Sequence, residues 1–412
     1  MLVLFRFGSF IPVPGISVDA LKSLVGGDTR TIFDMFNLFS GGNFARASIF
    51  AMGIMPYITS SIVMQLLGSI IPFFEKLKKE GAEGQKKLNQ YTRYGTVLVG
   101  IFNAIGMAVI IMSQEGVVNP EMSRGLFMFT TIISMVTGTM IVLWLGEQIT
   151  EKGIGNGISL IIFGGIIAEY PGQFIRMFTM IKDGAISIPN GAGVLLSMVV
   201  VTAAVILITE ATRRLNVQYP KRVVGRKVFG GQSTYIPLKV NAAGVIPIIF
   251  GQSVIMIPST IASFFPNTGF GNFMTDFFAP GKALYMALFM LLIVFFSYFY
   301  TAIIMNPVDM ADNMKKHGGF IPGIQPGKHT AAYINNVLTR ITLPGAIFFA
   351  FIAVVPDLMT IWVGNIPIYF GGTGIIIIVG VALETLRQIE SHLVMRHYDG
   401  FMKKGKLRGR QS

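Results

Sequence analysis

The chain has no cysteine among its 412 residues and only four histidines. Without cysteine it can form no disulfide, thiolate metal site or thiol nucleophile. The histidines lack the spacing of metal ligands, and the apolar stretches contain neither paired carboxylates nor a Ser/His/Asp set; the histidines are His317, His329, His392 and His397. The glycine-rich stretch Gly153–Gly157 lacks the strand and the Gly-Lys-Ser/Thr of a phosphate loop and predicts a tight turn. The sequence therefore indicates neither an enzyme nor a cofactor site.

Charge is also scarce. Asp, Glu, Lys and Arg make up 13% of the chain, against about 25% in a soluble domain. Nine stretches of 16 or more residues contain no charge, and a spanning helix needs roughly 20 apolar residues; they are Ala47–Phe74, Tyr94–Gln114, Gly125–Gly146, Gly153–Ala168, Gly184–Thr209, Val240–Thr275, Ala283–Val308, Ile341–Pro356 and Leu358–Leu383. Glu169 and Arg340 would complete the two shortest by reaching for the interface. With a short tenth segment from Met1 to about Pro14, we expect an all-α integral membrane protein of ten transmembrane helices.

The basic residues are distributed unevenly between the gaps. Of the 33 Lys and Arg residues, 25 fall in alternate gaps and only 7 in the others, with Arg6 inside the first segment. Because Lys and Arg collect on the cytoplasmic side, both termini are expected there. The net charge of +13 then belongs mainly to one face, which would meet anionic headgroups or an acidic partner.

Two gaps on the basic face are long, at residues 210–239 and 309–340. Alternating aromatic and β-branched residues and Pro-Gly turns indicate that both loops are ordered. A Gly-rich stretch between about Tyr170 and Gly193 separates five spans from five. We expect two halves of inverted topology around a central pore: residues 1–183, and residues 184–412 with both loops and a cytoplasmic tail at 389–412.

Five segments carry a more specific signal: ARASIFAMGIMPYI at Ala45–Ile58, GEQITEKGIGNGIS at Gly146–Ser159, VNAAGVIPIIF at Val240–Phe250, Asn306–Gly323, and YFGGT at Tyr369–Thr373. In this order and with these loop lengths the chain resembles the bacterial SecY family, the channel subunit of the Sec protein translocase. The resemblance implies a multi-pass channel of the bacterial cytoplasmic membrane that translocates unfolded preproteins and releases apolar segments into lipid. The implied partners are SecE, SecG, the SecA ATPase, the ribosome, and signal peptides of preproteins.

A secondary transporter for a small solute is the alternative. It would need an ionisable residue near the membrane midplane to couple an ion, and none is evident within the spans.

The resemblance implies that six isoleucines ring the narrowest point of the pore: Ile54, Ile58, Ile158, Ile162, Ile249 and Ile377. The first four form two pairs spaced four residues apart, so each pair shares one helix face. Branched aliphatic side chains offer water and ions no hydrogen bond, and a closed ring would gate by dewetting. Without the resemblance, each isoleucine would be interpreted as a lipid-facing or core residue.

The segment Thr31–Phe44 is too polar to span a membrane, too aromatic for a simple linker, and ends near a flexible glycine pair. In the SecY family this region, residues 31–44 here, is the plug that seals the outer funnel. Its candidate residues are Thr31, Phe33, Met35, Phe36, Leu38, Phe39, Gly41 and Gly42. The alternative is an amphipathic helix on the lipid surface.

Several spans contain polar residues, which are costly in a membrane and tend to be functional. By resemblance, the helices that carry them form the lateral gate, and the candidates are Thr59, Asn103, Gln252 and Ser253. A few interhelical hydrogen bonds of about 0.6 kcal/mol each would hold such a seam, and Pro247 and Pro258 indicate a movable helix. The alternative is ordinary polar packing between helices that never separate.

The basic loops are the expected docking surface for SecA or for the ribosome and its RNA, since Lys and Arg suit contact with a phosphate backbone. The candidates are Arg213, Arg214, Lys221, Arg222, Arg226, Lys227, Gln325 and Lys328. Alternatively these charges only set topology.

The chain departs from the family pattern twice. The first span has about half the usual length, which bears on assembly. Gln325 stands where the family typically has arginine, which bears on motor coupling.

Overall fold

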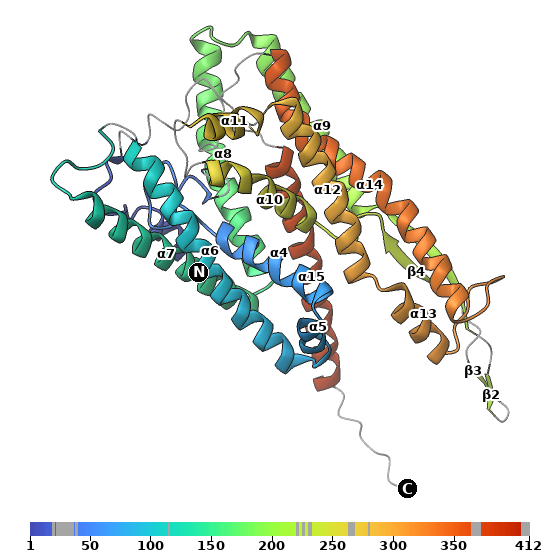
Figure 1. The fold of residues 1–412 in the computed structure, drawn as a ribbon. Coiled ribbons are helices and arrows are strands. Elements are labelled where there is room, and N and C mark those ends of the chain that lie inside the picture. The colour runs from blue at the N-terminus through green and yellow to red at the C-terminus, as the bar shows by residue number, and fades with distance from the viewer. Residues whose placement is uncertain are drawn as a thin grey trace.

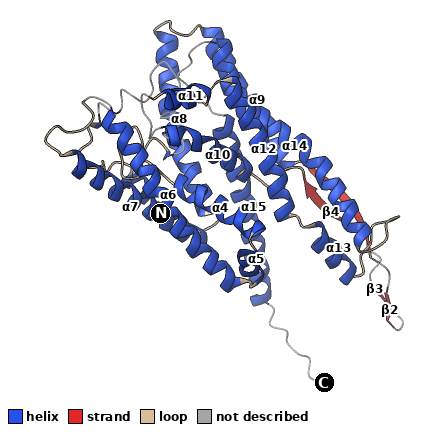
Figure 2. Cartoon of the chain, viewed as in Figure 1, coloured by secondary structure: helices blue, strands red, loops and turns tan. Residues whose placement is uncertain are grey.

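The computed structural model describes residues 1–18, 21, 37, 40–113, 116–219, 222–224, 227–229, 233–262, 268–278, 281–363 and 372–404. Long helices dominate this part of the chain (Figures 1 and 2). The first half contains α1 (Leu2–Gly8), α4 (Met55–Ile70), α5 (Pro72–Lys79), α6 (Ala82–Ser113), α7 (Arg124–Lys152) and α8 (Gly157–Lys182). The second half contains α9 (Ile188–Glu210), β1 (Thr212–Gln218), β2 (Arg222–Val224), β3 (Lys227–Phe229), β4 (Ser233–Lys239), α10 (Ile246–Ala262), α11 (Gly269–Phe277), α12 (Ala283–Ile304), α13 (Pro307–Lys316), α14 (Lys328–Val363) and α15 (Gly372–Lys404).

Each of the ten predicted apolar segments contains a helix. Among the described residues, 7 helices are long and apolar enough to cross a membrane, namely α6, α7, α8, α9, α12, α14 and α15. The bent pair α4 and α5 passes the same test as one unit, α10 has 17 residues and α1 has 7. The predicted all-α membrane architecture is therefore confirmed.

The bend between α4 and α5 follows from Pro72. Proline disfavours the helical region for the residue before it, and Ile71 is extended, with φ −96° and ψ 121°. The helix axes consequently turn by 96°. The run Ala47–Phe74 is thus not one straight span, because its helix begins only at Met55 and breaks at Ile71.

Other helix boundaries differ from the charge-free runs. Val240–Thr275 is not one segment: α10 begins at Ile246 after a turn, and α11 is separate. The run Leu358–Leu383 is divided as well, because its first six residues end α14 at Val363 and its residues from Gly372 onward belong to α15. The run Gly153–Ala168 enters α8 at Gly157, and the helix continues beyond Glu169 to Lys182. The run Ile341–Pro356 lies wholly inside α14, which begins before Arg340. Absence of charge locates apolar segments, but turns and prolines decide where helices begin and end.

The described residues of both long basic gaps form regular secondary structure, in agreement with the prediction of ordered loops. Strands β1 and β4 pair antiparallel from Thr212 opposite Lys239 to Gln218 opposite Ser233, and β2 pairs with β3. Residues 309–340 are mostly helical rather than a loop, because α13 and the first turns of α14 occupy them. Gln218 and Phe320 exchange backbone hydrogen bonds of 2.9 and 3.0 Å, which join the two regions. A small apolar core unites them into one body: Leu215, Val217, Leu238, Met314, Ile321, Ile334 and Leu338.

This body lies at one end of the bundle (Figure 1), together with α5 and the C-terminal part of α15. We call it the basic end, since it gathers the predicted basic gaps. The turn between α8 and α9 lies at the opposite end. The structure contains no membrane, so the side that the basic end faces stays a prediction.

Candidate functional site

The main hydrophobic core lies where the two halves of the bundle meet. It contains the six isoleucines that are predicted to ring the narrowest point of the pore, and we call these six residues the neck. Five of the six neck isoleucines are between 0 and 6% exposed, and the sixth, Ile158, is half-buried against them. They come from the start of α4, from α8, from α10 and from α15, so both halves contribute. All six therefore share one apolar cluster, and their arrangement as a ring stays a prediction.

Local structure fixes the neck residues on α4 and α8. The amide of Ile58 donates to the carbonyl of Ile54 at 3.1 Å, so the pair keeps helical spacing although Ile54 precedes the first turn. Asn156 caps α8, because its side-chain oxygen accepts the amides of Ile158 and Ser159 at 3.1 and 3.3 Å. The predicted tight turn between α7 and α8 is confirmed.

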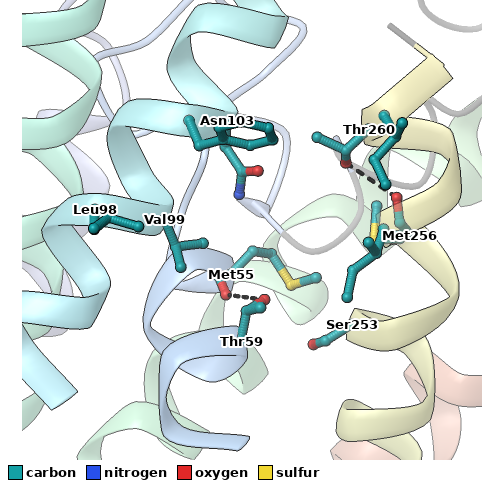
Figure 3. A pocket seen from close by; sticks show the side chains of 11 residues that line it. Met55, Thr59, Leu98, Val99, Asn103, Ser253, Met256 and Thr260 are labelled. Atoms are coloured by element: carbon teal, nitrogen blue, oxygen red, sulfur yellow. Dashed lines mark hydrogen bonds between the residues drawn. The ribbon is translucent and has the colours of Figure 1, made fainter. Parts of the chain in front are cut away.

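Beside the neck, helices α4, α6 and α10 enclose a cavity of about 240 Å³. We call this region the seam. Figure 3 shows Thr59 and Ser253 facing each other across it, with Asn103 pointing into the space between α6 and α10. Three of the four predicted gate residues therefore line one cavity. The remaining lining residues are Met55, Leu98, Val99, Phe102, Met256, Ile257, Thr260 and Ile261.

The hydroxyls of Thr59 and Ser253 bond within their own helices rather than across the seam. The hydroxyl of Thr59 donates to the carbonyl of Met55 at 3.2 Å, and that of Ser253 donates to Ile249 at 2.9 Å. Each hydroxyl is thus satisfied by its own helix (Figure 3 draws the first). Asn103 is half-buried, and none of the described residues hydrogen-bonds with its amide. The seam is closed mainly by apolar contact.

Gln252, the fourth predicted gate residue, points elsewhere. It is 1% exposed, and its amide nitrogen donates to the hydroxyl of Tyr285 on α12 at 3.4 Å. It therefore joins α10 to another helix of its own half and is not among the residues that line the cavity.

The sequence analysis missed a contact between the halves. The hydroxyl of Tyr300 on α12 donates to the side-chain oxygen of Gln65 on α4, and Phe250 packs edge-on against the Tyr300 ring at 5.1 Å. No pattern in the sequence singles out Tyr300. The lining residues Met256 and Thr260 were also missed, although they lie three and seven positions after Ser253 and so share its helix face.

Most of the predicted plug lies outside the described residues: Thr31, Phe33, Met35, Phe36, Leu38 and Phe39. Gly41 and Gly42 are described, with φ of +70° and +79°. A Cβ on Gly41 would come within 2.5 Å of the Gly165 Cα, and one on Gly42 within 1.8 Å of a Glu169 carboxylate oxygen. Glycine is required here both for the backbone conformation and for the close approach to α8.

The predicted docking residues lie on the body at the basic end. Arg213, Arg214, Gln325 and Lys328 are exposed, whereas Lys221 and Arg226 lie outside the described residues. Arg222 and Lys227 belong to β2 and β3. The Arg214 guanidinium stacks 4.8 Å from the centre of the Tyr235 ring.

Charged side chains lie where the body joins the bundle. Arg387 on α15 pairs with Glu210 at the end of α9 at 2.5 Å. Burial, reinforced by the charge of Arg387, lowers the pKa of Lys239. In the part of the chain that the structure describes, no three His, Cys, Asp or Glu side chains gather as metal ligands would.

Comparison with known sequences identifies the relatives of this chain. A sequence model of the SecY family matches residues 48–386. The protein translocase subunit SecY of Escherichia coli K12 is 45% identical over 415 residues, covering 99% of this chain and 93% of the relative. That of Thermus thermophilus is 43% identical, covering 100% and 94%.

Solved structures share the fold. A protein conducting channel superimposes with a TM-score of 0.66 at 16% identity, covering 95% of this chain and 90% of that one. A SecY protein whose plug domain stabilises the closed state gives 0.67 at 18% with the same coverage. Sec61 in the canine ribosome-channel complex gives 0.62 at 16%, also covering 95% and 90%. The sequence matches and the fold agree, and the chain belongs to the SecY family.

Proposed function

We propose that this member of the SecY family is the channel subunit of a protein translocase. It conducts unfolded preproteins across the membrane and releases apolar segments sideways into lipid. The observation that carries the proposal is the near full-length match to protein translocase subunits at 43 to 45% identity. The family is one of channel subunits rather than enzymes, and membership gives no support to the alternative of a solute transporter.

The neck serves as the ion barrier in this proposal. Its isoleucines come from both halves and lie in one apolar cluster. A narrow passage lined by such side chains excludes ions because water does not wet it, whereas an extended polypeptide can push the side chains aside. The described part of the plug, Gly41 and Gly42, lies against α8, which supports a second seal in the outer funnel.

The seam serves as the lateral exit. It separates α4 and α6 of one half from α10 of the other. Because Thr59 and Ser253 bond within their own helices, opening the seam breaks no hydrogen bond of theirs. The cavity between these helices supports a contact that parts more easily than a fully packed one.

The basic end is the docking surface. Related folds have been solved in ribosome complexes, namely canine Sec61 and the idle yeast Ssh1 complex on the 80S ribosome. We infer the same for this chain, with Arg213, Arg214, Lys328 and their neighbours meeting ribosomal RNA. SecE, SecG and SecA are the further partners that membership implies. The excess of Lys and Arg at this end supports a cytoplasmic orientation, with both termini on that side of the bacterial membrane.

A reconstituted transport assay tests the proposal. The chain with SecE and SecG goes into lipid vesicles, SecA and ATP are added, and preprotein protected from protease is measured. We expect ATP-dependent protection that a preprotein lacking its signal peptide does not show. Protection no greater than in vesicles without the chain would refute the proposal.

A further inference from the structure

Residues 40–46 form a short strap that crosses from α1 to α8. Its own turn is held by Ser40, whose hydroxyl accepts the Phe44 amide at 3.2 Å. On one side the guanidinium of Arg6 in α1 donates to the carbonyl of Gly41 at 3.2 Å. On the other side Gly41 lies against Gly165 in α8. The strap contains the last residues of the predicted plug, Ser40 to Phe44, and the two residues that follow them, so its attachment restrains the C-terminal end of that segment.

An ion pair holds the far end of the strap. Arg46 lies 3.3 Å from a carboxylate oxygen of Glu169, and the two side chains are 27 and 22% exposed. The Phe10 ring lies near both guanidiniums, 5.8 Å from Arg6 and 5.2 Å from Arg46. Among the described residues, the charges around the ring are two guanidiniums and one carboxylate. Removing the carboxylate would therefore leave two like charges near one ring without this counter-charge.

Two side chains of the strap have buried polar atoms without hydrogen-bond partners when the strap lies on α8. The Asn43 side chain is fully buried, and neither its amide nitrogen nor its oxygen has a hydrogen-bond partner among the described residues. One terminal nitrogen of Arg46 is equally unsatisfied. Buried polar groups without partners lose free energy relative to hydration, so lifting the strap into water would relieve them. The contact with Glu169 has to offset this tendency.

We propose that the Arg46 and Glu169 ion pair is a latch, in which Glu169 positions the strap on α8 and keeps the resting channel sealed. Its sealing role rests on the proposed function, whereas its structural role does not. The ion pair is only partly shielded from water. Breaking a fully buried pair would cost far more free energy, whereas a fully exposed pair would contribute little to holding the strap. A partly shielded pair can therefore hold the strap and still be broken. A preprotein entering from the neck would displace the strap by breaking one ionic contact.

The absence of cysteine allows a direct test. Ser40 is 1% exposed, so a thiol at Ser40→Cys reacts with a water-soluble maleimide only when the strap lifts. The full-length protein is labelled in lipid nanodiscs. We expect Glu169→Gln and Arg46→Gln each to raise the labelling rate about tenfold over Ser40→Cys alone, while Arg46→Lys, which keeps the charge, stays within about threefold. Arg176→Gln, an exposed charge on the same helix, is the matched control and should change nothing.

A double variant separates the pair from general loosening. If the two side chains act through each other, Arg46→Gln with Glu169→Gln labels no faster than either single variant, because the second change removes nothing further. The latch is refuted if the two substitutions multiply each other's effect on the labelling rate. It is also refuted if Glu169→Gln labels within twofold of the rate of Ser40→Cys alone. Preprotein transport by the unmodified chain is measured alongside: failure of transport with the labelling pattern intact refutes the proposed function and leaves the latch standing.

Discussion

The neck and the seam lie side by side between the two halves and are built in opposite ways. Five of the six neck residues are nearly fully buried branched aliphatics. The seam has small hydroxyl residues, an amide and a cavity of about 240 Å³. A well-packed apolar contact resists water and ions, whereas a contact with a void forgoes part of its packing energy. The difference fits the proposed function, in which the neck seals the channel and the seam opens to lipid.

Hydrogen bonding follows the same division. In the seam, Thr59 and Ser253 satisfy their hydroxyls within their own helices, so separation of the helices breaks neither of these two hydrogen bonds. In the part of the chain that the structure describes, a hydrogen bond between the halves joins Tyr300 to Gln65, and neither residue lines the cavity. The seam can therefore open at low cost while a bond elsewhere keeps the halves in register.

The largest effect is expected from making the neck polar. Replacing Ile58, Ile162 and Ile377 together by serine should raise resting ion conductance about a hundredfold, because polar side chains let the neck wet. Conductance in planar bilayers measures this. Serines at Ile133, Ile175 and Ile347, which are exposed on the outside of the bundle, are the control. Unchanged conductance in the first triple variant would show that these residues do not form the barrier.

Locking the seam should have the next largest effect. Cysteines at Thr59 and Ser253 face the same cavity, and joining them with a short bifunctional maleimide should reduce preprotein transport to about a tenth or less, since the open state becomes inaccessible. Each single cysteine variant, treated with the same reagent, is the control. Normal transport by crosslinked protein would mean that this contact is not an exit.

A smaller shift is expected from Asn103. Leucine in its place should favour the closed seam about threefold, because an apolar side chain adds packing contacts across the cavity. The change should show as slower transport of a preprotein with a weakened signal peptide. Asn103→Gln keeps the amide and should behave like the parent. Faster transport in the leucine variant would show that the Asn103 side chain favours the closed seam rather than the open one.

The smallest effect is expected outside the membrane, at Gln325. Its backbone carbonyl accepts the Thr330 hydroxyl at 2.9 Å, and its side chain is exposed, so substitution leaves the turn intact. Arginine there restores a charge and a bidentate donor, and SecA-driven import should rise about twofold. Gln325→Lys adds charge without the planar fork and should recover less. Equal import rates at equal channel density would show that this loop charge does not set coupling.

The sequence by itself determined the class of the protein. Nine runs without charge and a short first segment located ten apolar segments, the excess of basic residues in alternate gaps marked one end, and five motifs pointed to the SecY family. These features are encoded locally, because a membrane helix must satisfy its backbone within its own segment. Even the turn at Gly153–Gly157 could be predicted, since Asn156 caps α8 by accepting the amides of residues only two and three positions away.

Tertiary structure decided which polar residues face the seam. Thr59, Asn103 and Ser253 line the cavity while Gln252, adjacent to Ser253 in sequence, turns to Tyr285. Neighbouring positions on a helix point about 100° apart, so the choice between them depends on how α10 rests against its neighbours. The contacts of Tyr300 with Gln65 and of Arg46 with Glu169 join residues 235 and 123 positions apart. No local pattern encodes such pairs, because they exist only once the helices have packed.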